Sequence, residues 1–135
     1  MLVARTAALL VARLIFAFVF AQAAAFKLHF VGVDATASQI AAAGFPFPLL
    51  LAWIAALFEI ALAVAFLTGL LFREAAIVAA VYVLFLAFSF YGPERWNGDL
   101  MAYGMFVSHF PFIAGLLFAA VHGPGNVLVL RRRTI

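Results

Sequence analysis

Cysteine is absent from the 135-residue sequence, and charged residues make up only 10% of it. Without cysteine, the chain has no disulfide, no thiolate metal site and no thiol chemistry of its own. With so few charges it has almost no surface to offer to water, and 70% of its residues are hydrophobic. Together with a mean hydropathy of +1.25, this composition indicates an integral membrane protein.

Motifs of soluble enzymes and of nucleic-acid-binding proteins are also missing. The formal net charge is +3, but the basic residues are spread over the ends of apolar segments and a tail, so nucleic-acid binding is disfavoured. The sequence has no glycine-rich phosphate loop, no nucleophile elbow and no cysteine pair for haem. The three histidines, His29, His109 and His122, are not spaced as metal ligands. No self-sufficient catalytic constellation and no metal site are therefore expected.

Four apolar stretches are long enough to cross a hydrocarbon core of about 30 Å at about 1.5 Å per residue. They cover residues 6–26, 47–71, 75–91 and 100–121. The connection between the second and third stretches is short, which makes these two helices antiparallel neighbours. We expect an all-α, integral membrane, antiparallel four-helix bundle that forms a single transmembrane domain over residues 1–135.

The loop of residues 28–46 is long enough to contain structure of its own. Asp34 is a suitable N-cap for a short helix, and Gly44 followed by Pro46 is a suitable stop. We expect this short helix to lie on the membrane surface or to dip into the mouth of the bundle.

The distribution of lysine and arginine predicts the orientation of the chain. With four spans, one side of the membrane collects Arg5, Arg73 and the run Arg131–Arg133, whereas the other has only Lys27 and Arg95. By the positive-inside rule, both termini are expected in the cytoplasm. The arginine run is interpreted as a topological stop that also touches anionic lipid headgroups.

Glu59 lies at the centre of the second apolar stretch, where an acidic side chain costs about 2.5 to 3.5 kcal/mol on insertion scales. Such a carboxylate needs a partner or a proton. Arg13 is the other ionisable residue with long apolar sequence on both sides. We predict that Arg13 and Glu59 meet at similar depth as a buried ion pair. The pair is either structural, holding two helices together, or part of a proton or ligand site.

Three further polar residues define a predicted polar cavity. Lys27 lies on the same face of the first helix as Arg13, by the helical period. His109 lies near the middle of the fourth span, two residues before Pro111, which removes a backbone hydrogen bond and is expected to kink the helix. Together with the neighbouring Ser108, these residues are candidates for a polar cavity. For His109 the alternative is an ordinary packing role.

Several short segments share their order and spacing with one known family. They are Val11-Ala12-Arg13-Leu14-Ile15, Lys27, Gly44-Phe45-Pro46, Glu59, Gly69-Leu70-Leu71-Phe72-Arg73 and Gly123-Pro124-Gly125. Through these segments the chain resembles the DoxX family of small bacterial membrane proteins, from Val11 to Gly125. The resemblance implies a multi-pass protein of the bacterial inner membrane.

Members of this family are associated with membrane redox systems, including a subunit of thiosulfate:quinone oxidoreductase and a partner of superoxide- and thiol-handling enzymes. The resemblance implies an accessory subunit of a membrane oxidoreductase system, with no intrinsic cofactor, that contacts quinone or another lipid-soluble substrate near Arg13 and Glu59. The expected partners are membrane lipids, other membrane or redox subunits, and further copies of the chain. The rival hypothesis is a structural or assembly protein without a ligand site. A small-solute carrier is the third hypothesis. Whether the chain is itself an enzyme stays open.

Overall fold

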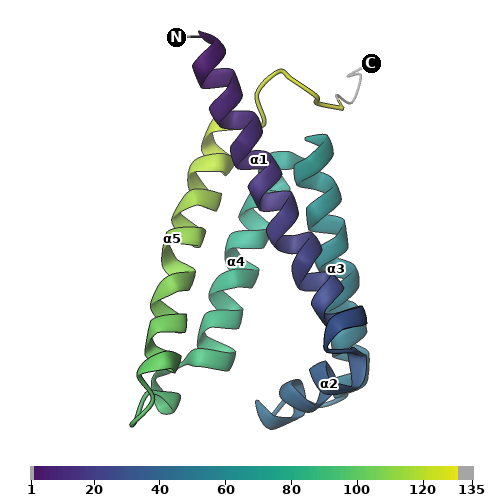
Figure 1. The fold of residues 1–135 in the computed structure, drawn as a ribbon, viewed down its shortest axis with the longest axis vertical. Coiled ribbons are helices and arrows are strands. Elements are labelled where there is room, and N and C mark those ends of the chain that lie inside the picture. The colour runs from purple at the N-terminus through teal and green to yellow at the C-terminus, as the bar shows by residue number, and fades with distance from the viewer. Residues whose placement is uncertain (1, 131–135) are drawn as a thin grey trace. The chain divides into compact units, whose positions relative to one another are not determined.

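The computed structural model describes residues 2–130, and helices are the regular secondary structure of this part of the chain (Figure 1). The elements are α1 (Leu2–Ala25), η1 (Phe26–Phe30), α2 (Val33–Ala42), α3 (Pro48–Thr68), α4 (Phe72–Tyr91), η2 (Pro93–Arg95) and α5 (Leu100–His122). Four helical segments are long and apolar enough to cross a membrane: Leu2–Phe30, Pro48–Thr68, Phe72–Arg95 and Leu100–His122. The predicted all-α class with four membrane-spanning helices is confirmed.

The chain divides into two compact units. The first contains the residues up to Leu70 together with the C-terminal segment from Pro124, and the second contains Leu71–Gly123. In the first unit α1 and α2 both pack against α3, and in the second α4 packs against α5. The single transmembrane domain therefore stays a prediction. The predicted topological stop at Arg131–Arg133 lies outside the described residues.

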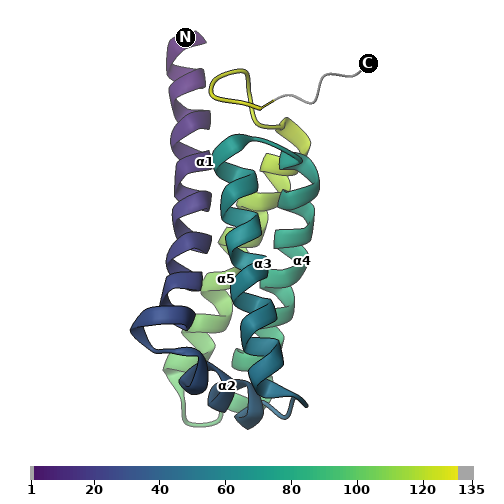
Figure 2. The same cartoon turned by 90° about the vertical axis from the view of Figure 1, so that its right-hand side faces the viewer.

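Within the first unit, α1 and α3 run in opposite directions and are offset along their length. The ring of Phe66 in α3 packs against two rings of α1, with centroids 5.3 Å from Phe16 and 5.7 Å from Phe20. Small residues buried along the two helices, such as Ala17 and Ala56, allow their backbones to approach closely. Figures 1 and 2 both show that the N-terminal part of α1 extends past the end of α3. This offset decides which polar residues meet.

The short helix expected in the first loop is α2. It begins at Val33, so the predicted N-cap Asp34 is wrong: Asp34 lies in the first turn, and Gly32 occupies the N-cap with φ of 91°. Glycine takes this backbone conformation without strain, which lets the chain turn sharply after η1. The predicted stop is confirmed, because the amides of Gly44 and Phe45 donate to carbonyls of the last turn of α2. The interfacial placement of α2 stays a prediction.

Within the second unit, the ends of α4 and α5 that η2 joins are held by aromatic packing and by a helix cap. Phe106 of α5 packs edge-on against Phe88 and Trp96, with ring centroids 5.1 Å and 5.0 Å apart. The indole of Trp96 donates to the carbonyl oxygen of Tyr91 at 2.7 Å. Asp99 caps α5, since its Oδ1 accepts from the amide of Ala102 at 3.1 Å.

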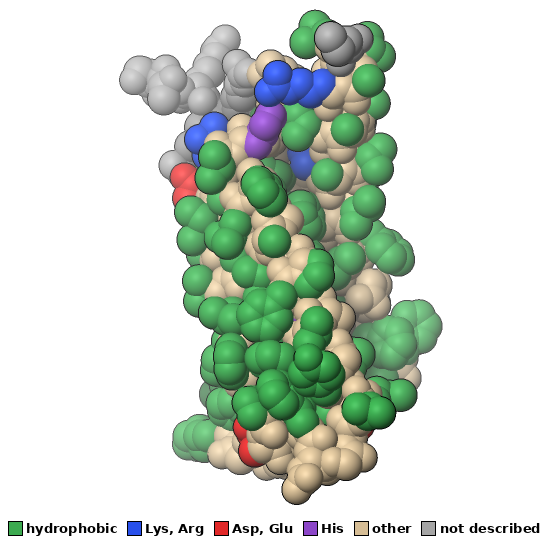
Figure 3. All heavy atoms as spheres, turned by 90° about the vertical axis from the view of Figure 1, so that its left-hand side faces the viewer, with side chains coloured by type: hydrophobic (Ala, Val, Ile, Leu, Met, Phe, Trp, Pro, Cys, Tyr) green, Lys and Arg blue, Asp and Glu red, His purple; other side chains and the backbone are tan. Residues whose placement is uncertain are grey.

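Large apolar side chains are exposed along all four long helices. Examples are Phe18 in α1, Val64 in α3, Val81 in α4 and Phe118 in α5. Figure 3 shows many apolar side chains on the surface of the helices. Such a surface would be unfavourable in water, whereas lipid tails solvate it well. The exposed helix surfaces thus agree with a membrane protein.

Candidate functional site

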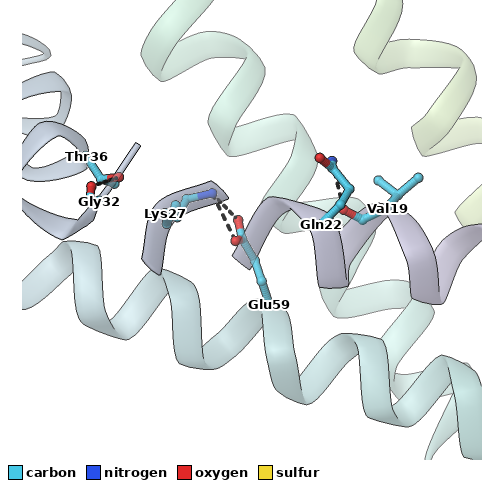
Figure 4. Close-up of polar contacts among 6 residues, drawn as sticks. All are labelled: Val19, Gln22, Lys27, Gly32, Thr36 and Glu59. Atoms are coloured by element: carbon cyan, nitrogen blue, oxygen red, sulfur yellow. Dashed lines mark hydrogen bonds and ion pairs between the residues drawn. The ribbon is translucent and has the colours of Figure 1, made fainter. Parts of the chain in front are cut away.

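The carboxylate of Glu59 is bound by Lys27. The Lys27 ammonium donates to both oxygens, with Nζ 2.8 Å from Oε1 and 2.9 Å from Oε2 (Figure 4). The Glu59 side chain is 2% exposed, while that of Lys27 is 25% exposed. The buried negative charge is therefore compensated by a cation that can still be reached from outside the unit.

A π-helical turn places Lys27 opposite α3. In η1 the amide of Val31 donates to the carbonyl of Phe26 at 2.9 Å, a bond across five residues instead of four. The wider turn redirects the side chains that follow α1, and such turns occur frequently at functional sites. The same turn packs against both α2 and α3. The position of Lys27 is thus fixed by the end of α1 and by its packing on the neighbouring helices.

Arg13 has a different environment, made of backbone carbonyl groups. Its Nε donates to Phe66 at 3.2 Å, and Nη2 donates to Leu67 and Leu128 at 2.9 Å each. Its Nη1 donates to Val127 at 2.7 Å and makes a longer bond of 3.5 Å to Pro124. The carbonyls of Phe66 and Leu67 belong to the last turn of α3, where a helix lacks its own donors and carries partial negative charge. Arg13 therefore caps α3 and fastens the C-terminal segment to it.

The predicted ion pair between Arg13 and Glu59 is wrong. Each residue lies near the middle of its own helix, and the prediction assumed that the two midpoints lie at the same level. Because α1 extends past α3, Arg13 instead lies opposite the end of α3 at Phe66, and Glu59 lies opposite Lys27. At about 1.5 Å per residue, Arg13 and Lys27 are roughly 20 Å apart along α1. A ligand or proton role for Glu59 stays a prediction.

Ser108 and His109 lie on α5, and their side chains form hydrogen bonds within that helix. Both side chains hydrogen-bond to the carbonyl oxygen of Met105, one helical turn earlier. The half-buried ring of His109 also packs against Tyr91, with ring centroids 5.5 Å apart. These residues belong to the second unit and Lys27 to the first, so the predicted polar cavity of Lys27, Ser108 and His109 stays a prediction. The helix continues through Pro111 to His122.

A second arginine, Arg73, holds the end of α5 in the second unit. Arg73 donates from Nη2 to the carbonyl of His122 at the end of α5, at 3.4 Å. Next in the chain, Gly123 has φ of 84°, and a Cβ there would lie 2.9 Å from the Arg73 side chain. In the first unit, Gly69 has φ of 75° and a Cβ there would lie 3.3 Å from Arg13. Each unit thus joins an arginine to a glycine-terminated helix end.

Comparison with known families decides the membership of this chain. A sequence model of the DoxX family matches residues 8–92, which is more than half of its length. The chain belongs to the DoxX family. The match includes Arg13, Lys27 and Glu59, whereas Ser108 and His109 lie beyond it. No curated protein and no solved structure matches the chain.

This DoxX protein is an integral membrane protein with four apolar helices of spanning length. Within residues 2–130 no group of three or more histidine, cysteine, aspartate or glutamate side chains could hold a metal ion. The ammonium of Lys27 and the carboxylate of Glu59 can supply hydrogen bonds and charge at the site.

Proposed function

We propose that this DoxX protein is an accessory subunit of a membrane oxidoreductase system in the bacterial inner membrane. In this proposal, Lys27 and Glu59 contact a quinone or another lipid-soluble substrate. The observation that carries it is the burial of Glu59, 2% exposed, beside an ammonium that is 25% exposed. Ionisable residues inside membrane helices commonly mark substrate or proton pathways.

The pair supplies two functions that a quinone site needs. Reduction of a quinone to its hydroquinone consumes two electrons and two protons. The Lys27 ammonium has three N–H donors, so one can bind a quinone carbonyl while others hold Glu59, and the carboxyl group can pass on a proton. The electrons would come from a redox partner subunit, which is why we propose an accessory role. Arg13 is less suited, since its nitrogens are directed at backbone carbonyls.

The second candidate is a structural or assembly protein. It is favoured by the observation that both carboxylate oxygens of Glu59 and all three nitrogens of Arg13 bind groups of the chain itself. In that case the charged residues fix the helices. Partner subunits, or further copies of the chain, would then dock on the exposed apolar helix faces.

Replacement of Glu59 by glutamine separates the two candidates. Glu59→Gln keeps the volume and removes the charge and the titratable proton. If the pair serves a quinone, the variant is expected to stay folded while bound quinone and quinone-linked activity in membranes fall, by about tenfold or more if proton transfer is involved. Asp34→Asn is the matched control, because Asp34 is an exposed acidic residue of α2. Unchanged quinone retention and activity in a well-folded Glu59→Gln protein would favour the structural candidate.

We further propose that both termini lie in the cytoplasm. The arginine bias toward the ends of the chain and the turn after α3 supports this orientation. The pair of Lys27 and Glu59 would then lie toward the periplasmic side. A C-terminal tag should be protected from a protease added to intact spheroplasts. Digestion of the tag would show that the C-terminus faces the periplasm.

A further inference from the structure

The Arg13 guanidinium is buried without an anionic partner among residues 2–130. It is 3% exposed, and its partners are the backbone carbonyls of Phe66, Leu67, Pro124, Val127 and Leu128. A guanidinium binds a carboxylate or phosphate more strongly than a neutral carbonyl, because the hydrogen bonds are charge-assisted and form in pairs. The present partners therefore satisfy its donors and leave its positive charge without a counter-ion.

The C-terminal segment supplies three of these five carbonyls. Residues 124–130 contain no helix, and one further backbone bond, from the amide of Leu130 to Thr68 at 2.8 Å, holds the segment to α3. Leu128 has φ of 51°, in the left-handed region that is strained for a branched residue. Arg13 is thus the principal polar anchor of a strained segment.

The position of Arg13 along α1 brings it close to the level of lipid headgroups. It lies opposite the last turn of α3, whose membrane-spanning helix ends at Thr68. The end of a spanning helix is where the hydrocarbon core gives way to headgroups. An arginine at this level is within reach of phosphate if the segment that covers it moves away.

We propose that residues Pro124–Leu130 form a latch over Arg13, and that opening of the latch converts Arg13 into a binding site for a phosphate group. When the latch is closed, Nη1 and one bond of Nη2 are directed at the segment. When it is open, these two nitrogens form a fork that matches two phosphate oxygens. The phosphate could belong to a phospholipid headgroup or be free in solution. This site is independent of Lys27 and Glu59 and goes beyond the proposed function.

The absence of native cysteine makes the latch directly measurable. Val129→Cys places one thiol on the segment beside Gly69, and the rate of its reaction with a maleimide reports opening. The protein is purified in a phosphate-free non-ionic detergent and labelled alone, with added phosphatidylglycerol, or with inorganic phosphate. Leu100→Cys, at a position that is 86% exposed, is the control for reagent reactivity.

We expect phosphatidylglycerol to accelerate labelling of Val129→Cys by about fivefold or more, a coupling of ordinary size, and to leave Leu100→Cys unchanged. Acceleration by inorganic phosphate as well would identify free phosphate as a sufficient ligand, and acceleration by the lipid alone would identify the headgroup. Adding Arg13→Ala should give fast labelling under all three conditions. If that variant does not fold, the change in the labelling rate of Val129→Cys with Arg13 intact is sufficient to test the proposal.

Two results would overturn the proposal. One is a labelling rate of Val129→Cys that neither phosphatidylglycerol nor phosphate changes. The other is loss of the acceleration when Arg131, Arg132 and Arg133 are replaced by glutamine, because the lipid would then act by attracting the basic tail and not by binding Arg13.

Discussion

Lys27 Nζ lies 2.8 Å from Oε1 and 2.9 Å from Oε2 of Glu59, so that a residue following α1 neutralises the one acidic residue of α3. Arg13, which lies on α1, does not pair with Glu59 and caps the end of α3. Arg13 and Lys27 therefore have separate roles. Lys27 compensates a buried charge, and Arg13 ties α1, α3 and the C-terminal segment together.

Arg13 should not be replaceable by lysine. Arg13→Ala leaves the carbonyls of Phe66 and Leu67 without their donor and should lower the free energy of unfolding by about 3 kcal/mol. Arg13→Lys should recover only part of this lost stability, because one ammonium cannot bind α3 and the C-terminal segment together as a guanidinium fork does. Thermal unfolding in detergent measures both.

The control for these variants is Arg95→Ala. Arg95 is 40% exposed and its Nε lies 4.0 Å from Glu94, so the change should be about 0 to 1 kcal/mol. An Arg13→Lys protein as stable as the wild type would show that the fork of hydrogen bonds is unimportant.

Gly69 should resist substitution for two reasons. Its φ is 75°, and a Cβ would lie 3.0 Å from Val129 and 3.3 Å from Arg13. Gly69→Ala should therefore cost about 2 kcal/mol or more, from backbone strain and crowding together. Gly98→Ala, with φ of 77° and open space, isolates the strain and should cost about 1 kcal/mol.

Gly104→Ala completes the series. It lies inside α5 with nothing within 4 Å of the added Cβ, and alanine should stabilise the helix by about 0.5 kcal/mol. Equal melting temperatures for the alanine variants of Gly69 and Gly104 would rule out the close approach at the end of α3.

Asp99 should matter more than Asp34, although both lie near the start of a helix. Asp99→Ala removes the acceptor for the amide of Ala102 and should cost about 1 kcal/mol. Asp99→Asn should retain most of the stability, because an amide oxygen can also cap. For Asp34→Ala we expect only a few tenths of a kcal/mol, since Gly32 is the N-cap of α2. Amide hydrogen exchange at Ala102 reports the loss of the Asp99 cap directly. Unchanged protection of this amide in Asp99→Ala would contradict the capping role of Asp99.

Composition and apolar length were sufficient to predict the four spans. A stretch such as residues 100–121 has to satisfy its backbone internally in lipid, which leaves a helix as the solution, and the observed α5 begins at the same residue. The stop at Gly44 was predictable for a local reason, because glycine readily adopts the left-handed conformation that ends α2.

The partner of Glu59 could not be predicted, because it depends on how far α1 slides along α3. Arg13 and Lys27 lie on one face of the same helix, about four turns apart, so the helical period allows either to meet Glu59. The stagger comes from packing, in which Phe66 lies between Phe16 and Phe20. The π turn at η1, with its five-residue bond from Val31 to Phe26, follows from no recognised sequence pattern.

A comparison of two double-mutant cycles tests whether Glu59 pairs with Lys27 and not with Arg13. The variants are Lys27→Met, Glu59→Gln and Arg13→Ala, alone and in the two pairs that contain Glu59→Gln, with stability measured in one detergent. Lys27→Met should cost about 3 kcal/mol by leaving Glu59 buried and uncompensated, and most of this loss should disappear once Glu59 is also replaced. Arg13→Ala and Glu59→Gln should add to within about 0.5 kcal/mol. Additive losses for Lys27 with Glu59, together with strong coupling for Arg13 with Glu59, would show that Glu59 pairs with Arg13 and not with Lys27.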